Sequence, residues 1–174
     1  MPLKPAVNED DHIQGGKDAP VELVEYGDYE CPHCGRAYPI IKNIQAKMGD
    51  KLKFVFRNFP LAESHPNAIA AAIATEAADL QGKFWEMHDL IYEHQRALSV
   101  DSLLNYAQEQ ELDMHRFSKD FSDKQSLAKV EEDFESGIRS GVNGTPSFFI
   151  NGDKYDGDWS EETLLSVLTE KTGD

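Results

Sequence analysis

The residues best suited to chemistry are two cysteines separated by two positions, in the sequence Cys31-Pro32-His33-Cys34. They are the only cysteines among the 174 residues. A bridge across so short a loop removes little entropy from the unfolded chain, so it would stabilise a fold poorly. Such a pair is better suited to opening and closing, because a thiolate attacks disulfides. The spacing therefore favours redox exchange.

The cysteine pair stands between a predicted strand and a predicted helix. Residues 21–26 are rich in β-forming side chains and lie between a proline and a glycine, which favours a strand. After the pair, apolar residues recur at helical spacing as far as Gly49, a typical C-cap residue. Cys31 is therefore expected at a helix N-terminus, where unsatisfied N–H groups favour a thiolate.

This placement gives the four residues of the motif different roles. Cys31 is expected to be the exposed nucleophile, and Cys34 the more buried thiol that resolves a mixed disulfide. His33, when protonated, adds positive charge beside the Cys31 sulfur and tunes the redox poise. Pro32 is tolerated in the first helical turn because it has no N–H to leave unsatisfied.

Four separated motifs follow one another along the chain: GDYECPHCGRAYP, FRNFPL, GKFWEMHD and GVNGTPSFFING. In this order they resemble the bacterial DsbA family of thiol–disulfide oxidoreductases. The resemblance implies an α/β thioredoxin fold, in which a central mixed β-sheet is flanked by helices and carries an all-helical insertion. It also implies that the chain exchanges disulfides with cysteine-containing proteins or peptides.

The resemblance extends to a proline far from the cysteines in sequence. In the DsbA family a cis proline faces the cysteine pair, and the residue before it contacts the incoming peptide. The matching residues here are Thr145 and Pro146, so both are expected to bind substrate. An ordinary trans proline opening a strand is the alternative. Threonine before the proline resembles isomerase and cytosolic relatives more than the DsbA prototype, which leaves the direction of exchange open.

Glu25 is a candidate proton donor and acceptor. It lies six residues before Cys31, where DsbA-like proteins carry an acid, and strand alternation points it inward. A buried carboxyl group could pass a proton to or from Cys34. The alternative is a solvent-facing charge near a strand end. Asp28 and Glu30 are expected to be exposed and to oppose the thiolate.

The rest of the chain is expected to form an arm, a core and an insertion. Residues 1–18 are polar and lack periodicity, which predicts a flexible N-terminal arm. The thioredoxin-like domain is expected over residues 19–62 and 141–174, and the helical insertion domain over residues 63–140. Ser64 is expected to cap the first helix of that insertion.

Several elements are predicted within these parts. Residues 147–150 should form a strand that turns at Asn151-Gly152 into a partner strand, and Ser160 should cap a final helix. An apolar helical stripe within the insertion includes Phe84, Met87, His88 and Ile91.

Charge and composition exclude several classes of function. Lys and Arg number 17 against 32 Asp and Glu, giving a net charge of −15, which argues against nucleic-acid binding. The sequence contains no apolar run long enough for a membrane span. It also lacks a nucleotide-binding motif, so no cofactor is expected beyond the cysteine pair and an external redox partner that recycles it.

The protein is expected to be a monomer. The absence of a signal peptide predicts a cytoplasmic protein, or a periplasmic one if an export signal was trimmed.

The sequence thus predicts a thiol–disulfide oxidoreductase, with reductase or isomerase activity as the alternative direction. Two other classes stay open. One is a peptide-binding module whose disulfide is incidental, and the other is a zinc protein in which His65 or His88 completes the cysteine site. Both histidines are interpreted instead as capping or core residues, and no metal site is predicted.

Overall fold

The computed structural model describes residues 1–173, which divide into two compact units. The sheet unit comprises Met1–Gly27, Arg36–Arg57 and the described residues from Glu135 onward. The helical unit comprises Asp28–Gly35 and Asn58–Phe134. The sequence placed residues 28–35 with the sheet, whereas their contacts, described below, are with the helical segments.

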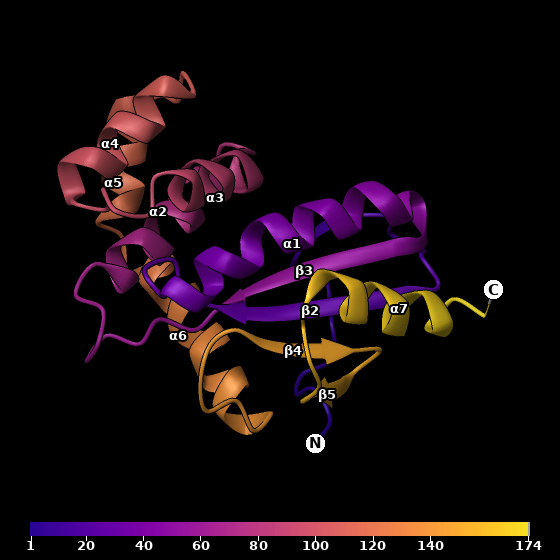
Figure 1. Cartoon of the computed structure of the whole chain (residues 1–174). Coiled ribbons are helices and arrows are strands. Elements are labelled where there is room, and N and C mark those ends of the chain that lie inside the picture. The colour runs from indigo at the N-terminus through magenta and orange to yellow at the C-terminus, as the bar shows by residue number, and fades with distance from the viewer. Residues whose placement is uncertain (174) are drawn as a thin grey trace. The chain divides into compact units, whose positions relative to one another are not determined.

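The sheet unit is built on five strands in the order β1-β3-β2-β4-β5 (Figure 1). Their bounds are β1 His12–Gly15, β2 Val21–Gly27, β3 Leu52–Asn58, β4 Ser147–Ile150 and β5 Asp153–Tyr155. β1 pairs antiparallel with β3, and β4 pairs antiparallel with both β2 and β5. Leu23 and Val24 are successive in β2 and both fully buried, so this central strand is covered on both faces.

Helices α1 (Pro32–Met48) and α7 (Glu161–Lys171) lie beside each other along the sheet (Figure 1). Lys47 of α1 forms an ion pair with Glu161 at 2.9 Å, and Asn43 donates to the same carboxylate at 2.8 Å. Ser160 caps α7 as predicted, because its Oγ accepts from Thr163 N. The helix after the cysteines ends before Gly49, also as predicted.

The predicted hairpin between β4 and β5 is confirmed. Ile150 pairs with Asp153, so the loop has two residues, Asn151 and Gly152. Both have positive φ, 50° and 87° respectively. This conformation favours Asn-Gly and matches the twist of the flanking strands.

The expectation of a flexible arm over residues 1–18 is wrong. His12–Gly15 forms β1, and Leu3 is buried. Asp11 forms an ion pair with Arg57 of β3 at 2.8 Å, with side chains only 4% and 2% exposed. Four residues of edge strand are too short to give a periodic pattern, and a buried ion pair leaves no hydrophobic signal.

The helical unit contains α2 (Ala68–Asp79), α3 (Phe84–Glu93), α4 (Val100–Glu109), α5 (Met114–Phe121) and the first part of α6 (Lys124–Arg139). The predicted apolar stripe on α3 is buried, at Phe84, Met87, His88 and Ile91. Ser99 and Asp113 cap α4 and α5 through their side chains.

The first helix of this unit begins later than predicted. The N–H groups of Ser64 and His65 both donate to Leu61 O, which closes a turn, and α2 starts only at Ala68. Ser64 is therefore a turn residue rather than a cap. Asn67 occupies the N-cap position instead, without a side-chain capping bond.

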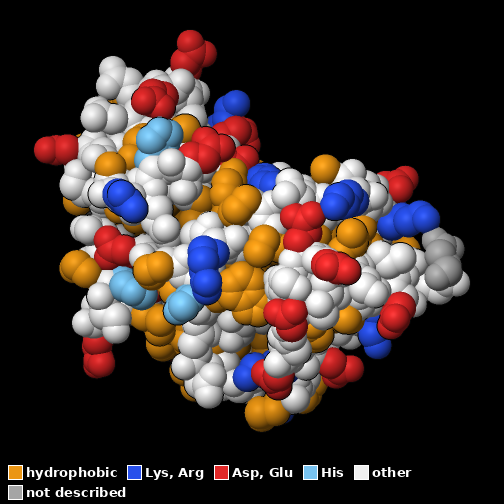
Figure 2. Space-filling view, viewed as in Figure 1, with side chains coloured by type: hydrophobic (Ala, Val, Ile, Leu, Met, Phe, Trp, Pro, Cys, Tyr) orange, Lys and Arg blue, Asp and Glu red, His pale blue; other side chains and the backbone are white. Residues whose placement is uncertain are grey.

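The surface reflects the acidic composition. Figure 2 shows Asp and Glu side chains scattered over the viewed face, with Lys and Arg side chains interspersed. Among the helices of the described residues, none is long and apolar enough to cross a membrane.

Candidate active site

The cysteine pair occupies the start of α1, as predicted. Gly35 N donates to Cys31 O at 3.0 Å, so Cys31 accepts the first bond of the helix and stands at its N-cap. Pro32 is the first helical residue, where its missing N–H has no cost. His33 follows on the exposed side of this turn. Unsatisfied N–H groups of the first turn lie beside Cys31 and favour negative charge there.

Both sulfur-bearing residues are buried. Cys34 is fully buried and Cys31 is 3% exposed, so the expectation of an exposed Cys31 is wrong for this conformation. Asp28 N donates to Cys34 Sγ at 3.4 Å. This N–H would stabilise negative charge on Cys34 when that sulfur becomes a thiolate.

Gln95, in the segment after α3, covers the backbone just before the helix. Its side-chain amide donates to Tyr29 O at 3.0 Å and to Cys31 O at 2.7 Å. A β-carbon at Gly35 would collide with Gln95 Oε1, so a larger residue there would displace the end of the Gln95 side chain. Gln95 therefore holds the backbone on both sides of Glu30.

Asp28 is buried, in contrast to the expectation of an exposed acid, and is only 1% exposed. Its Oδ1 accepts from Glu30 N at 2.8 Å. Its Oδ2 accepts from Leu61 N at 2.8 Å and from His65 Nδ1 at 2.8 Å. The carboxylate thus holds the segment after β3 against the loop that precedes Cys31.

Glu30 is half-buried and binds the residue before α2. Its two carboxylate oxygens accept from Asn67 N at 2.9 Å and from Asn67 Nδ2 at 2.8 Å. Negative charge is favourable at this helix N-terminus. Glu30 is therefore committed to α2.

Tyr29 anchors the same loop in the core of the helical unit. Its hydroxyl shares a hydrogen bond of 2.8 Å with His88 Nδ1, and its ring packs edge-on against His88 and tilted against Tyr92. The interpretation of His88 as a core histidine is confirmed. Each of the residues 28–31 is thus held by a contact from elsewhere in the helical unit.

The pKa of His65 is shifted from its usual value by its neighbours in the site. Burial lowers its pKa, but the hydrogen bond and charge of Asp28, with the charges of Cys31 and Glu30, outweigh burial and raise the pKa above 6.5. The His65 side chain is 19% exposed, so its imidazole can exchange protons with solvent. It neither caps α2 nor lies wholly in the core.

The other predicted site residues belong to the sheet unit. Glu25 is 3% exposed, which excludes the solvent-facing alternative, and it pairs in register with Phe148. The Thr145–Pro146 peptide bond is cis, as the resemblance implies. Pro146 directly precedes β4, so it stands at the end of the β2–β4 pair that carries Glu25.

Sequence reasoning missed three residues that shape the site. Asp28 directly follows β2, and His65 lies in the segment between β3 and α2; β2 and β3 are neighbours in the sheet. A strand–helix–strand unit brings such loops to one edge, and this signal could have paired the two residues. Gln95 lies in an irregular segment with no pattern that would single it out.

A second polar cluster in the helical unit brings together Asn58, Glu76 of α2, and Lys129 and Asp133 of α6. Asp133 accepts from Lys129 Nζ at 2.6 Å and from Asn58 N at 3.0 Å, while Asn58 Nδ2 donates to Glu76 at 3.0 Å. Burial raises the pKa of Asp133, and the Glu76 charge adds to this effect against that of Lys129. These bonds tie α2 to α6.

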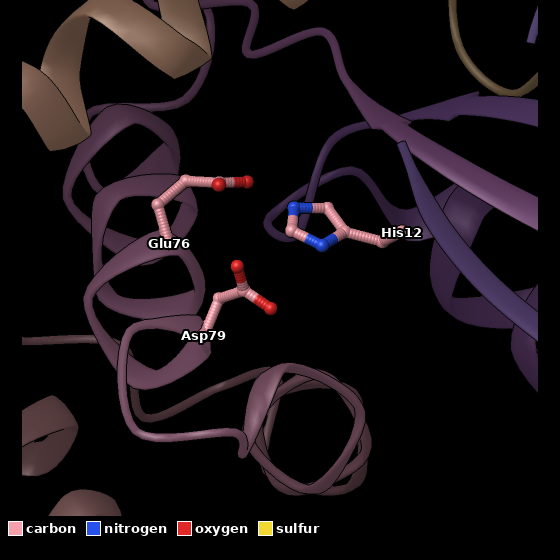
Figure 3. A group of neighbouring side chains, drawn as sticks. All are labelled: His12, Glu76 and Asp79. Atoms are coloured by element: carbon pink, nitrogen blue, oxygen red, sulfur yellow. The ribbon is translucent and has the colours of Figure 1, made fainter. Parts of the chain in front are cut away.

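Figure 3 shows Glu76 and Asp79 extending from neighbouring turns of α2. One carboxylate oxygen of each residue lies within 4.8 Å of the other. The third labelled residue, His12, belongs to β1 of the sheet unit. The two α2 carboxylates form an acidic pair on one side of that helix.

Comparison with known proteins supports the predicted fold. The family model described as thioredoxin matches residues 7–170. The chain is 41% identical over 167 residues to the "Na(+)/H(+) antiporter NhaA 1" of Salinispora arenicola, covering 96% of this chain and 26% of that protein. It is 42% identical over 168 residues to the protein of the same name from Mycolicibacterium vanbaalenii, covering 95% and 27%. The chain thus spans about a quarter of the length of these relatives.

Three solved structures share the fold. A thioredoxin-like oxidoreductase from Silicibacter pomeroyi aligns with a TM-score of 0.84 and 23% identity, covering 96% of this chain and 95% of that one. BdbD from Bacillus subtilis has a TM-score of 0.83 and 22% identity, covering 95% of each chain. The α-DsbA1 protein of Wolbachia pipientis has a TM-score of 0.86 and 21% identity, covering 98% and 94%. The predicted thioredoxin fold with DsbA-like architecture is confirmed.

Proposed function

Because the chain belongs to the thioredoxin family, we propose that it exchanges disulfides with cysteine-containing proteins or peptides through Cys31 and Cys34. The observation that carries this proposal is the position of the pair. Cys31 stands at the N-cap of α1, and Cys34 lies one turn further in and accepts the N–H of Asp28. Both positions stabilise a thiolate.

In the reducing direction, the Cys31 thiolate attacks one sulfur of a substrate disulfide. A bond forms between that sulfur and Cys31, and the other substrate sulfur leaves as a thiolate and takes a proton. Cys34 then loses its proton and attacks the Cys31 sulfur, which releases the second substrate thiolate and leaves the Cys31–Cys34 disulfide. Two electrons pass from the pair to the substrate, and the reverse sequence oxidises a substrate dithiol.

Three residues of the sheet unit complete the proposal. Glu25 takes the proton that Cys34 loses and returns it in the reverse reaction. Its burial, with only 3% of Glu25 exposed, suits a carboxyl group that is neutral for part of the cycle. Thr145 and Pro146 bind the substrate chain in an extended form beside β4. The cysteine pair carries both electrons, so the reaction uses an external thiol or disulfide in place of a cofactor.

The proposal is tested with two serine variants that differ only in which sulfur is lost. Cys31→Ser should abolish turnover with a disulfide-bonded peptide and a thiol reductant. Cys34→Ser should still attack once and accumulate a mixed disulfide of one peptide per protein, seen by mass spectrometry. Appreciable turnover in Cys31→Ser would refute the assignment.

The direction of exchange is decided by the reduction potential of the pair in glutathione buffers. A value near the roughly −120 mV of DsbA would mark an oxidant, and one near the roughly −270 mV of thioredoxin a reductase. Threonine before Pro146 favours the reductase or isomerase alternative by resemblance.

The NhaA name of the relatives belongs to proteins of which this chain covers about a quarter. We therefore propose disulfide exchange for the region of those longer proteins that aligns with this chain, and not for the whole of them.

His33 is expected to favour the Cys31 thiolate, because a protonated imidazole in the same turn attracts negative charge. His33→Ser should move the thiolate absorbance of Cys31 to a higher titration midpoint and make the disulfide less oxidising. His94→Ser, at an exposed histidine after α3, is the matched control and should leave both quantities unchanged. An unchanged midpoint in His33→Ser would contradict this role.

A further inference from the structure

We propose that Asp28 and His65 form a positioning pair whose protonation state sets how readily Cys31 becomes a thiolate. The inference deepens the proposed function and rests on it, since it assigns a regulator to the nucleophile of that reaction. It concerns a histidine outside the cysteine motif, 34 positions after Cys31 in the numbering of the chain.

The first observation is that one residue contacts both cysteines and the histidine. Asp28 O accepts from Cys31 N at 3.1 Å, and Asp28 N donates to Cys34 Sγ at 3.4 Å. The carboxylate of the same residue accepts from His65 Nδ1 at 2.8 Å. A change in the Asp28–His65 bond therefore acts on a residue whose backbone is bonded to both ends of the redox pair.

The second observation is that the pair is held in place while its proton remains exchangeable. The Asp28 side chain is fully buried, whereas the His65 side chain is 19% exposed. Leu61 N donates to the same carboxylate oxygen as His65, and His65 N donates to Leu61 O, so the turn fixes the ring against Asp28. Titration of His65 therefore changes charge without releasing the loop.

The third observation is that the charged groups around His65 favour its protonated form. The titratable groups that act on His65 in the helical unit are Asp28, Glu30 and Cys31, and each raises its pKa against the effect of burial. Coupling between two titrating groups is reciprocal. If the Cys31 thiolate stabilises the imidazolium, the imidazolium stabilises the thiolate by the same free energy. With His65 neutral, the nearby acids would disfavour a further negative charge on Cys31.

Protonation of His65 should change the oxidising strength of the Cys31–Cys34 disulfide. A stabilised thiolate stabilises the reduced protein and makes the disulfide more oxidising. The pair should therefore be a stronger oxidant while His65 is protonated and should lose this advantage as pH rises through the His65 titration.

The first experiment titrates the thiolate absorbance of reduced wild-type protein, His65→Gln and His115→Gln. The last variant makes the same change at an exposed histidine of α5 and is the control. We expect a midpoint about half a pH unit or more higher in His65→Gln, corresponding to roughly threefold less thiolate below the midpoint. A midpoint equal to that of wild type would overturn the proposal.

The second experiment keeps His65 and removes the Cys31 charge, so it does not depend on how His65→Gln folds. The imidazole of His65 is titrated by nuclear magnetic resonance in reduced wild-type protein and in Cys31→Ser. We expect a lower His65 midpoint in the serine variant, because the thiolate no longer stabilises the imidazolium. Equal midpoints would overturn the proposal.

Asp28→Asn separates the two partners. It should lower the His65 midpoint in the same experiment, since the variant removes the carboxylate that binds Nδ1. An unchanged His65 midpoint would overturn the assigned pair. None of these titrations uses a substrate, whereas the proposed function is decided by turnover of the cysteine variants. Failure of the Asp28–His65 proposal is therefore distinguishable from failure of the proposed disulfide exchange.

Discussion

Asp28 and Glu30 place two negative charges within three residues of Cys31, and each would raise the free energy of its thiolate if it faced the sulfur. At the scale of residues, the structure gives each carboxylate another partner. Asp28 binds Leu61 N and His65, and Glu30 binds Asn67. Acidic residues beside the nucleophile thus serve as anchors for the loop.

Stability should depend on pH through His65. Its folded pKa lies above the usual value, so the pair contributes stability that is fully present below about pH 6.5. This stability is lost as pH rises through the folded pKa. Urea unfolding of a Cys31→Ser/Cys34→Ser background between pH 5.5 and 8 should show the decrease. Adding His65→Gln should flatten it, and an equally steep decrease in that variant would assign the effect to another group.

At the scale of elements, the loop before α1 is held by side chains from other segments of the helical unit. Gln95 donates to two carbonyl groups of the loop, at Tyr29 and Cys31. His88 of α3 binds the Tyr29 hydroxyl. The geometry at the cysteines therefore depends on α3 and the segment after it as well as on α1.

Gln95→Leu should destabilise the protein, because the partly buried carbonyl groups of Tyr29 and Cys31 each lose a side-chain hydrogen bond. The Cys31 carbonyl keeps the bond from Gly35 N. The expected loss in the free energy of unfolding is about 1–3 kcal/mol, measured by urea denaturation of the reduced form. Gln108→Leu, the same change at an exposed position of α4, should stay within about 0.5 kcal/mol of wild type. Equal stability of the two variants would mean that Gln95 contributes no net stabilisation.

At the scale of the whole molecule, the first residues of the chain are part of the sheet unit. Asp11 forms two bonds to the Arg57 guanidinium, and Arg57 also donates to Tyr26 Oη at 2.9 Å. Tyr26 Oη in turn lies 2.7 Å from Ser136 Oγ. This chain of bonds joins the residue before β1 to β2, β3 and α6.

Asp11→Ala should therefore be strongly destabilising, since it leaves the charge of a buried guanidinium without its carboxylate. The expected loss is about 3–5 kcal/mol in the free energy of unfolding, measured by urea denaturation. Asp10→Ala, at the exposed neighbouring position, is the matched control. A loss below 1 kcal/mol in Asp11→Ala would show that water or another group replaces the carboxylate.

The elements that could be predicted are those whose local pattern matches their environment. The strand before Cys31, the helix after it and the Asn151–Gly152 turn follow from periodicity and turn chemistry. The shared edge of β2 and β3 could have placed Asp28 near His65. The burial of Asp28 could not be predicted from it, because burial also depends on Leu61 and His65 folding back onto a short polar loop. The bonds from Gln95 to the Tyr29 and Cys31 carbonyls could not be predicted either, because Gln95 lies in an irregular segment without a periodic pattern.

The N-terminal segment also bears on self-association. β5 is an edge strand of three residues, and such edges pair readily with other chains. Here Pro2 bridges to Asp153, Leu3 N donates to Gly152 O at 2.8 Å, and Lys154 N donates to Met1 O at 3.1 Å. The first three residues thus occupy hydrogen-bonding groups that a second molecule could otherwise use. The segment therefore protects this edge against aggregation, in addition to its contribution to the stability of the fold.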